Sequence, residues 1–252
     1  MLPVKFITWQ REHSLVQGVA GSLVITLAVL LLQGTGVFES ADLKVYDGLL
    51  RARPGSETAD ARIVLIEMTE GDIQKQGRWP VTDAVLAAVL GRVAQAKPRA
   101  IGLDLYRDIE VPPGREELNR ELLHDGAVIV VTKVGGPSNA RISPPSVLEG
   151  SEQTGFNDIL IDKDGVVRRG LLFLDEKDEV RYSFALRLAL RYLQAEGVYP
   201  APDPVNQDFL RLGSVTFRPL ETSDGGYVNA DAGGYQFLLD YRGAGLKPVS
   251  YS

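Results

Sequence analysis

The sequence predicts a mixed α/β domain that follows one N-terminal transmembrane helix. Three observations predict this architecture. An uncharged segment over residues 14–38 is long enough to cross a bilayer. Three apolar segments then alternate with helical patterns, an order typical of a partly parallel sheet with crossover helices. After residue 155, turn signals separate shorter strands, which indicates an antiparallel hairpin extension.

The uncharged segment is the first element. Residues 23–32 are apolar except for Thr26, and a membrane-spanning helix needs about 20 such residues. A helix buried in a soluble core would keep a polar face. A cleaved signal peptide would need small residues at its cleavage site, which residues 34–36 match poorly. An uncleaved anchor is the preferred interpretation, with a signal peptide and a soluble helix as alternatives.

Flanking charges predict the orientation of this helix. Lys5 and Arg11 precede it, whereas Glu39 and Asp42 follow it. Basic residues stay on the cytoplasmic side of a membrane helix, so the N-terminus is expected inside the cell. The predicted parts are a cytoplasmic segment over residues 1–14, a transmembrane helix over residues 15–38 and an extracytoplasmic domain over residues 39–252, in the periplasm or outside the cell.

The exported domain is expected to begin with a helix over residues 41–53 that continues from the membrane span. Three continuous apolar segments follow, of the kind buried on both faces of a parallel sheet. These predicted strands cover residues 62–67, 99–105 and 126–132. The helices between them are one capped by Thr82 or Asp83 that runs to about Ala96, and a short one over residues 115–124.

The second half of the chain predicts a different arrangement. Residues 155–159 and 166–174 flank Asp162-Lys163-Asp164-Gly165, a hairpin turn signal. Asp162 and Asp164 also resemble the start of a calcium loop, but the twelfth position is Phe173 where that loop needs Glu. A hairpin turn is therefore the preferred interpretation. An amphipathic helix over residues 181–195 and strands over residues 209–217 and 235–241 complete the predicted elements.

Charged residues at the ends of the predicted parallel strands suggest a ligand site. Glu67, Asp104 and Lys133 lie at or just past the carboxyl ends of these strands, the edge where open α/β sheets bind ligands. The alternative is that charges appear wherever a buried strand meets water. Trp79, followed by Pro80, is either an aromatic anchor over the sheet edge or a surface that stacks on a ligand.

Composition excludes several classes of function. The chain has no cysteine, two histidines and a formal net charge of −6. Thiolate metal sites and disulfides are therefore excluded, and the acidic surface disfavours nucleic acid. His13 and His124 are expected on opposite sides of the membrane, so a histidine metal site or catalytic triad in the exported domain is possible only around His124. His124 ends a predicted helix, and a C-terminal capping role is its preferred interpretation. No phosphate-binding glycine loop or kinase motif occurs, and no cofactor is predicted.

A series of short motifs also follows a recognisable order. These are Glu39, Tyr46-Asp47, Arg51, a strand over residues 63–67, Gly77-Arg78-Trp79-Pro80, a strand over residues 100–104, Gly155-Phe156, residues 162–169 (Asp-Lys-Asp-Gly-Val-Val-Arg-Arg) and Tyr241-Arg242-Gly243. The order resembles that of CHASE2 extracellular sensor domains of bacterial signalling proteins. Two departures are Glu67, where the family usually has Asp, and residues 81–83, where it usually has aromatic and arginine residues.

The resemblance implies a membrane-bound sensory input module that binds a small molecule or a partner protein and relays binding through the membrane helix. On this reading the chain is not an enzyme, and any catalytic output lies in a missing region or a partner chain. One rival function is a docking module that is completed by another chain. Another is an exported hydrolase with Glu67 and Asp104 as an acid/base pair.

Two expectations concern partners. A homodimer is expected, with the Gly18 to Ser22 face near the twofold axis, or else a hetero-partner that carries an output domain. In the family a further helix and apolar strand follow the Tyr241-Arg242-Gly243 motif. The domain is therefore expected to be C-terminally incomplete at Ser252, with further residues or a separate polypeptide completing the sheet.

Overall fold

The structure, a computed structural model, describes residues 4–54, 60–135, 140–176, 179–241 and 248–250. The chain divides into two compact units. The first comprises Met1–Pro54 and Glu221–Asp231, and the second comprises Gly55–Leu220 and Ala232–Ser252.

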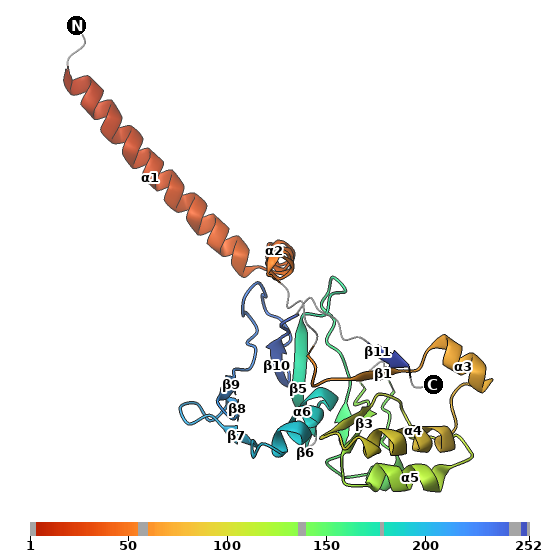
Figure 1. The fold of residues 1–252 in the computed structure, drawn as a ribbon. Helices are drawn as coiled ribbons and strands as arrows, with labels where there is room; N and C mark the ends of the chain where they lie inside the picture. Colours follow the sequence, from red (N-terminus) through yellow and green to blue (C-terminus); the bar gives the residue numbers. More distant parts are fainter. Residues whose placement is uncertain (1–3, 55–59, 136–139, 177–178, 242–247, 251–252) are drawn as a thin grey trace. The chain divides into compact units, whose positions relative to one another are not determined.

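Two helices dominate the first unit, α1 (Val4–Gly34) and α2 (Glu39–Ala52) (Figure 1). Within α1, Gln17–Gly34 is long and apolar enough to cross a membrane, with a mean hydropathy of 1.7 and 0% of it buried. A signal sequence near the N-terminus has the same length and composition. The predicted apolar N-terminal helix is therefore present, consistent with an anchor or a signal sequence.

A turn separates α1 from α2, so the expectation of one continuous helix is wrong. The Thr35 hydroxyl donates to the Leu32 carbonyl oxygen at 2.6 Å. Gly36 has a φ of 78°, a left-handed backbone conformation that glycine adopts readily and that commonly ends helices. The sequence Gly34-Thr35-Gly36, weighed above only as a cleavage site, is thus the local cause of the break.

The start of α2 packs against residues 221–231, which come from late in the sequence. A Cβ added to Gly226 would lie 3.1 Å from the Cβ of Asp42, so the two backbones approach closely at this position. Leu43 and Tyr227 are both buried. The late segment is held by its own turns, in which the Glu221 amide donates to Asp224 Oδ2 at 2.9 Å and the Ala230 amide donates to the Thr222 carbonyl oxygen at 2.8 Å.

A three-stranded parallel sheet forms the centre of the second unit. Its strands are β2 (Ile101–Leu103), β3 (Val128–Thr132) and β4 (Thr154–Phe156), in the order β2-β3-β4. The helices α4 (Asp83–Gln95) and α5 (Arg115–Leu123) lie side by side (Figure 1). Leu86 and Leu90 of α4 join Leu118 and Leu122 of α5 in one buried cluster with Val130 of β3. The predicted capping role of Thr82 is confirmed, because its side chain accepts from the Val85 amide at 3.3 Å.

A further helix, α6 (Phe184–Gln194), contacts all three strands of this sheet. The approach is closest at two glycines. A Cβ added to Gly155 would lie 2.5 Å from the Cα of Phe184, and one added to Gly102 would lie 2.8 Å from the Cζ of the same residue. Side chains alternate between the faces of a strand, and Ile101 and Leu103 pack with α4 and α5. Gly102 therefore faces α6 on the opposite side.

The first predicted strand has different neighbours from those expected. β1 (Leu65–Glu67) pairs in parallel with β11 (Pro248–Ser250) in a separate two-stranded sheet. Ile63, Val64, Leu65 and Ile66 are 42% to 68% exposed. The expectation that this segment is buried on both faces is therefore wrong for the part of the chain that the structure describes. An apolar sequence favours a strand, but the strand becomes buried only where other elements cover both of its faces.

The predicted hairpin is corrected in part. The turn itself forms, since the Gly165 amide donates to the Asp162 carbonyl oxygen at 2.9 Å. Gly155 and Phe156, however, belong to β4 of the parallel sheet, and one isolated bridge joins Leu160, just past the first predicted arm, to Arg169 of the second. β5 (Arg169–Glu176) pairs instead with β6 (Glu179–Tyr182) and β10 (Tyr235–Leu238).

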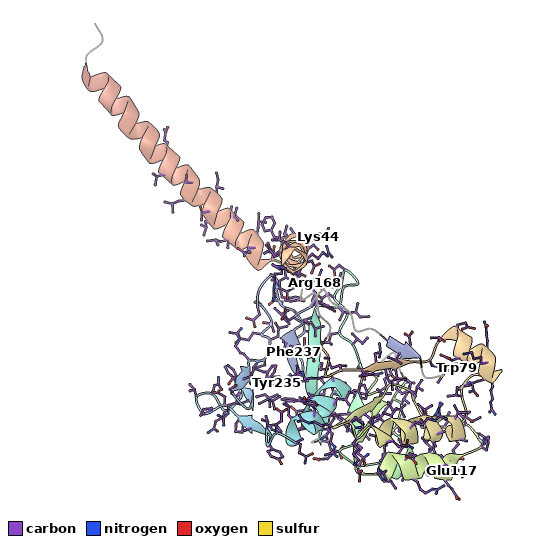
Figure 2. The ribbon with its side chains drawn as sticks, in the orientation of Figure 1. Lys44, Trp79, Glu117, Arg168, Tyr235 and Phe237 are labelled. Atoms are coloured by element: carbon purple, nitrogen blue, oxygen red, sulfur yellow. The ribbon has the colours of Figure 1, made fainter. Side chains whose placement is uncertain are left out.

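The antiparallel part contains a second three-stranded sheet and a small aromatic core. This sheet is formed by β7 (Pro200–Pro202), β8 (Leu210–Leu212) and β9 (Val215–Phe217). Tyr235 and Phe237, labelled on β10 in Figure 2, pack into a cluster with Leu172 and Leu186. The Tyr235 hydroxyl also accepts from the Leu210 amide at 2.7 Å, which ties β10 to β8. Two short helices, α3 (Glu70–Gln76) and η1 (Ser146–Leu148), complete the described elements.

Candidate functional site

The four candidate ligand-binding residues, three from the predicted strand ends and Trp79, lie in different surroundings. Glu67 ends β1 and is exposed, and Trp79 is 54% exposed. Asp104 follows β2 and is exposed, with its Oδ1 accepting from Asn157 Nδ2 at 3.2 Å. Lys133 directly follows β3 and lines a cavity of about 450 Å³ that includes none of the other three.

This cavity, called the basic cavity below, lies at the carboxyl ends of β3 and β4. One wall is the ladder in which Lys133 and Ile142 exchange two backbone hydrogen bonds of 3.0 Å. The opposite part comes from β6 and the first turns of α6. Its charged lining residues are Lys133, Arg141, Glu149, Glu179, Arg181 and Arg187. Four cations thus face two acids, in a chain whose formal net charge is −6.

Two of the four cations are neutralised by acidic neighbours. Glu176 lies 3.3 Å from Arg141 Nη1 and 3.4 Å from Arg181 Nε, so one carboxylate serves both guanidinium groups. Arg181 also lies 2.8 Å from Glu179. This part of the lining carries little surplus charge.

Arg187 is the most buried of the three arginines that line the cavity. Its side chain is 18% exposed, and the guanidinium lies 4.3 Å from the centre of the Tyr182 ring. Its acidic neighbour is Glu152, at 3.7 Å, whose side chain is 93% exposed. Burial lowers the pKa of Arg187, with the Glu152 charge as the main opposing effect. Its Nε has no hydrogen-bond acceptor among the residues described.

The basic residues from β6 and α6 were missed by sequence reasoning. Arg181 and Arg187 were read as part of an amphipathic helix over residues 181–195. Their position over the end of β3 depends on β4 pairing in parallel with β3 and on α6 packing against Gly155. The glycine at position 155 was the one sequence signal of this packing, and a lone glycine in a strand does not identify which element approaches it.

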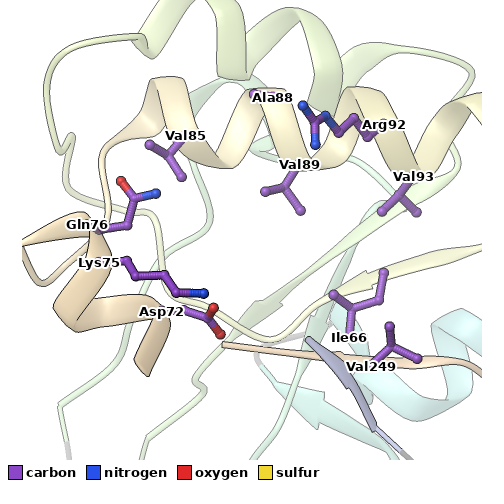
Figure 3. A pocket seen from close by; sticks show the side chains of 10 residues that line it. All are labelled: Ile66, Asp72, Lys75, Gln76, Val85, Ala88, Val89, Arg92, Val93 and Val249. Atoms are coloured by element: carbon purple, nitrogen blue, oxygen red, sulfur yellow. The ribbon is translucent and has the colours of Figure 1, made fainter. Parts of the chain in front are cut away.

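A second concave surface, called the apolar groove below, lies between α4 and the β1–β11 pair. Its volume is about 410 Å³. Val85, Val89 and Val93 of α4 face Ile66 of β1 and Val249 of β11 across it (Figure 3). Asp72 and Lys75 of α3 line one end of the groove. Asp72 is held in place by the Thr69 hydroxyl, which donates to its Oδ2 at 2.6 Å.

The acidic turn over residues 162–165 is tied to arginines. Asp162 Oδ2 accepts from Arg168 Nη1, and Asp164 Oδ1 accepts from the same atom, both at 2.9 Å. Arg169 Nε donates to Asp162 Oδ1 at 2.9 Å. Among the residues searched, no cluster of three histidine or acidic side chains is arranged to hold a metal ion. The motif therefore builds an ion-pair network that fixes the turn.

Comparison with known proteins identifies the family. The family model for the CHASE2 domain matches residues 24–252, nearly the whole chain. A search of curated proteins and a search of solved structures each found no match. CHASE2 domains are extracytoplasmic sensor domains and are typically non-catalytic. With its apolar N-terminal helix, its mixed α/β fold and this match, the chain belongs to the CHASE2 family of extracellular sensor domains.

Proposed function

We propose that this protein is a membrane-anchored sensory input module that binds a small extracytoplasmic ligand in the basic cavity. Binding is relayed through α2 to the membrane helix α1. The observation that carries the proposal is the position of the cavity in a sensor-family domain. It lies at the carboxyl ends of two adjacent parallel strands, where open α/β sheets bind ligands.

The chemistry of the site favours binding over catalysis. The hydrolase alternative requires Glu67 and Asp104 to act on one substrate as an acid/base pair. Glu67 ends a strand of one sheet and Asp104 follows a strand of another, and neither lines the basic cavity. The cavity instead offers guanidinium and ammonium groups, which recognise ligands without a bond being broken.

The relay is supported by the way α2 is packed. Residues 221–231 cover the first turns of α2, and the chain continues from both ends of this segment into the second unit. A change in β10, which follows the segment directly, would be transmitted through the backbone to residues that touch α2. Thus a ligand-dependent shift in the second unit has a covalent route to the helix that precedes it.

The proposed topology follows from the flanking charges and is open to a clean test. Because the chain has no native cysteine, a single Thr216→Cys substitution on exposed β9 creates one thiol. A membrane-impermeant maleimide added to intact cells with a permeable outer membrane should label this thiol. Labelling that requires lysis of the inner membrane would contradict an extracytoplasmic domain.

Ligand-dependent relay has its own test. A Val45→Cys variant places a thiol on the exposed side of α2, where Val45 is 61% exposed. In membranes, the rate at which two copies are cross-linked through this thiol should change when the cavity is occupied. An unchanged rate at saturating ligand, with binding confirmed separately, would argue against the relay.

A second candidate function is docking, and the apolar groove favours it. Ile66 and Val249 are 42% and 56% exposed beside the valines of α4, an apolar surface of the kind that marks protein interfaces. Because twofold dimers of identical chains are the commonest assemblies, we infer that a second copy of the chain covers this groove. Light scattering of the full chain in detergent should then show a dimer that Val89→Asp dissociates. The control Val205→Asp should leave the dimer intact, because Val205 is 94% exposed and does not line the groove. A wild-type monomer would contradict this.

A further inference from the structure

Arg187 carries a charge that its surroundings only partly balance. Guanidinium groups keep their proton in proteins, so the side chain stays cationic even though only 18% of it is exposed. The Glu152 carboxylate is 93% exposed and 3.7 Å away, so water screens most of its attraction. A mostly buried cation is stable where anions or acceptors surround it. The inside of the cavity therefore favours an additional anion next to Arg187.

Lys133 adds a second cation at the same cavity. It is partly buried at the end of β3, and the described residues place no acidic side chain within 4 Å of its ammonium group. Arg141 and Arg181, by contrast, share Glu176. Among the residues described, Lys133 thus forms no ion pair and Arg187 forms one only with an exposed carboxylate, and these two lining cations come from elements far apart in the sequence.

The shape of the site limits the size of the anion. A cavity of about 450 Å³ matches the volume that small ligands occupy in proteins. The planar guanidinium fork binds two oxygens of a carboxylate or phosphate at once, and an ammonium group adds a point charge. The Arg187 guanidinium lies over the Tyr182 ring, with its Cζ 4.3 Å from the ring centre.

From these observations we propose that the ligand of the basic cavity is a small anion whose carboxylate or phosphate group lies between Lys133 and Arg187. This inference rests on the proposed sensory function and assigns the chemical class of its ligand. The chain is acidic overall and repels such an anion elsewhere on its surface, so the anion would bind at this cavity in preference to other positions.

The test measures anion binding to the full chain in detergent at constant ionic strength. The probes are inorganic phosphate, acetate, succinate and citrate, with sodium chloride as the reference salt. At least one probe should raise the thermal unfolding midpoint in a saturable manner beyond the chloride reference. Success with phosphate alone would assign a phosphate group, and success with the carboxylates alone would assign a carboxylate.

Variants link that binding to the cavity. Arg187→Gln and Lys133→Gln should each weaken the binding of the active probe by about tenfold or more, because each removes a charge-assisted hydrogen bond. Arg187→Lys keeps the charge but loses the planar fork, so its affinity should fall between wild type and Arg187→Gln. Arg120→Gln is the matched control, since this arginine is 75% exposed on α5, and its affinity should equal that of wild type.

Three outcomes would overturn the inference. These are no saturable effect of any probe, unchanged affinity in both glutamine variants, or equal loss in Arg120→Gln. If Arg187→Gln does not fold, Lys133→Gln decides the matter. If an anion binds but the cross-linking rate of α2 does not change, the proposed relay is wrong and the assigned ligand class still holds. If no anion binds but a neutral ligand changes the cross-linking rate, the sensory function stands and the proposed anionic ligand class is wrong.

Discussion

The carboxylate of Asp162 lies 2.9 Å from Arg168 Nη1, and both side chains are almost completely buried. Asp162 also accepts from Arg169, which in turn donates to the amide oxygen of Gln236 on β10 at 2.9 Å. One acidic side chain therefore joins the turn, the start of β5 and the neighbouring strand β10. This network gives a physical reason for the Asp-x-Asp-Gly-x-x-Arg-Arg pattern in the sequence.

Removing Asp162 should be among the most damaging single changes in the domain. Asp162→Ala would leave two buried guanidinium groups without their shared carboxylate, a change that typically costs about 3–5 kcal/mol. The free energy of unfolding, measured by urea denaturation, should fall by that amount. Asp164→Ala is the comparison, because that side chain is 33% exposed, and its loss should be smaller. Equal effects would contradict a special role for the buried carboxylate.

The same network predicts a pH dependence. The hydrogen bond from Arg168 holds the pKa of Asp164 at about 2, below its usual value. Because the folded-state pKa is lowered, the stabilisation is present above the unfolded pKa, near 3.9, and is lost as the pH falls through about 2. NMR titration of the Asp164 carboxyl carbon should give a midpoint near 2. In Arg168→Gln the midpoint should return toward 3.9.

Gly155 should not tolerate a side chain. A Cβ there would lie 2.5 Å from the backbone Cα of Phe184, so α6 would have to move away from the sheet. Overpacking of this kind costs about 1–3 kcal/mol, and Gly155→Ala should show that loss in thermal unfolding. At Gly102 the obstacles are the ends of flexible side chains of Phe184 and Leu188. Gly102→Ala should therefore cost less, and the reverse order would refute the packing argument.

A Tyr227→Ala substitution should separate ligand binding from its relay. Tyr227 is buried in the segment that covers the start of α2, and its truncation removes packing at that contact. Anion affinity, measured by calorimetry, should stay within about twofold of wild type, because the basic cavity shares no residue with this segment. The ligand-dependent change in Val45→Cys cross-linking should disappear. Retention of that change would place the relay elsewhere.

Local patterns predicted much of the fold, and the exceptions have physical causes. Thr82 followed by an apolar periodic segment was sufficient to place the start of α4, because capping depends on neighbouring residues only. The same sequence reasoning put Gly155 in a hairpin, since strand propensity contains no information about which partner a strand chooses. The parallel pairing of β4 with β3 depends on α6, which follows later in the chain.

The sequence predicted where the candidate site lies better than it predicted which residues form it. Lys133 was identified because the ends of parallel strands can be read from apolar segments. Arg187 was missed because its helix reaches the cavity through packing at a glycine, a contact between distant parts of the sequence. Glu67 and Asp104 were grouped with Lys133 on the assumption of one continuous sheet, whereas β1 pairs with β11 outside it.

The contact between Gly226 and Asp42 has a consequence for how the protein is made. α2 leaves the ribosome early, but the segment that covers it is synthesised near the end of the chain. On the proposed topology, Leu43 stays uncovered until that late segment has been translocated. Chains that stall during export would leave Leu43 of α2 exposed to water. On the proposed topology, the contact between Gly226 and Asp42 therefore forms only after residues 221–231 have been exported.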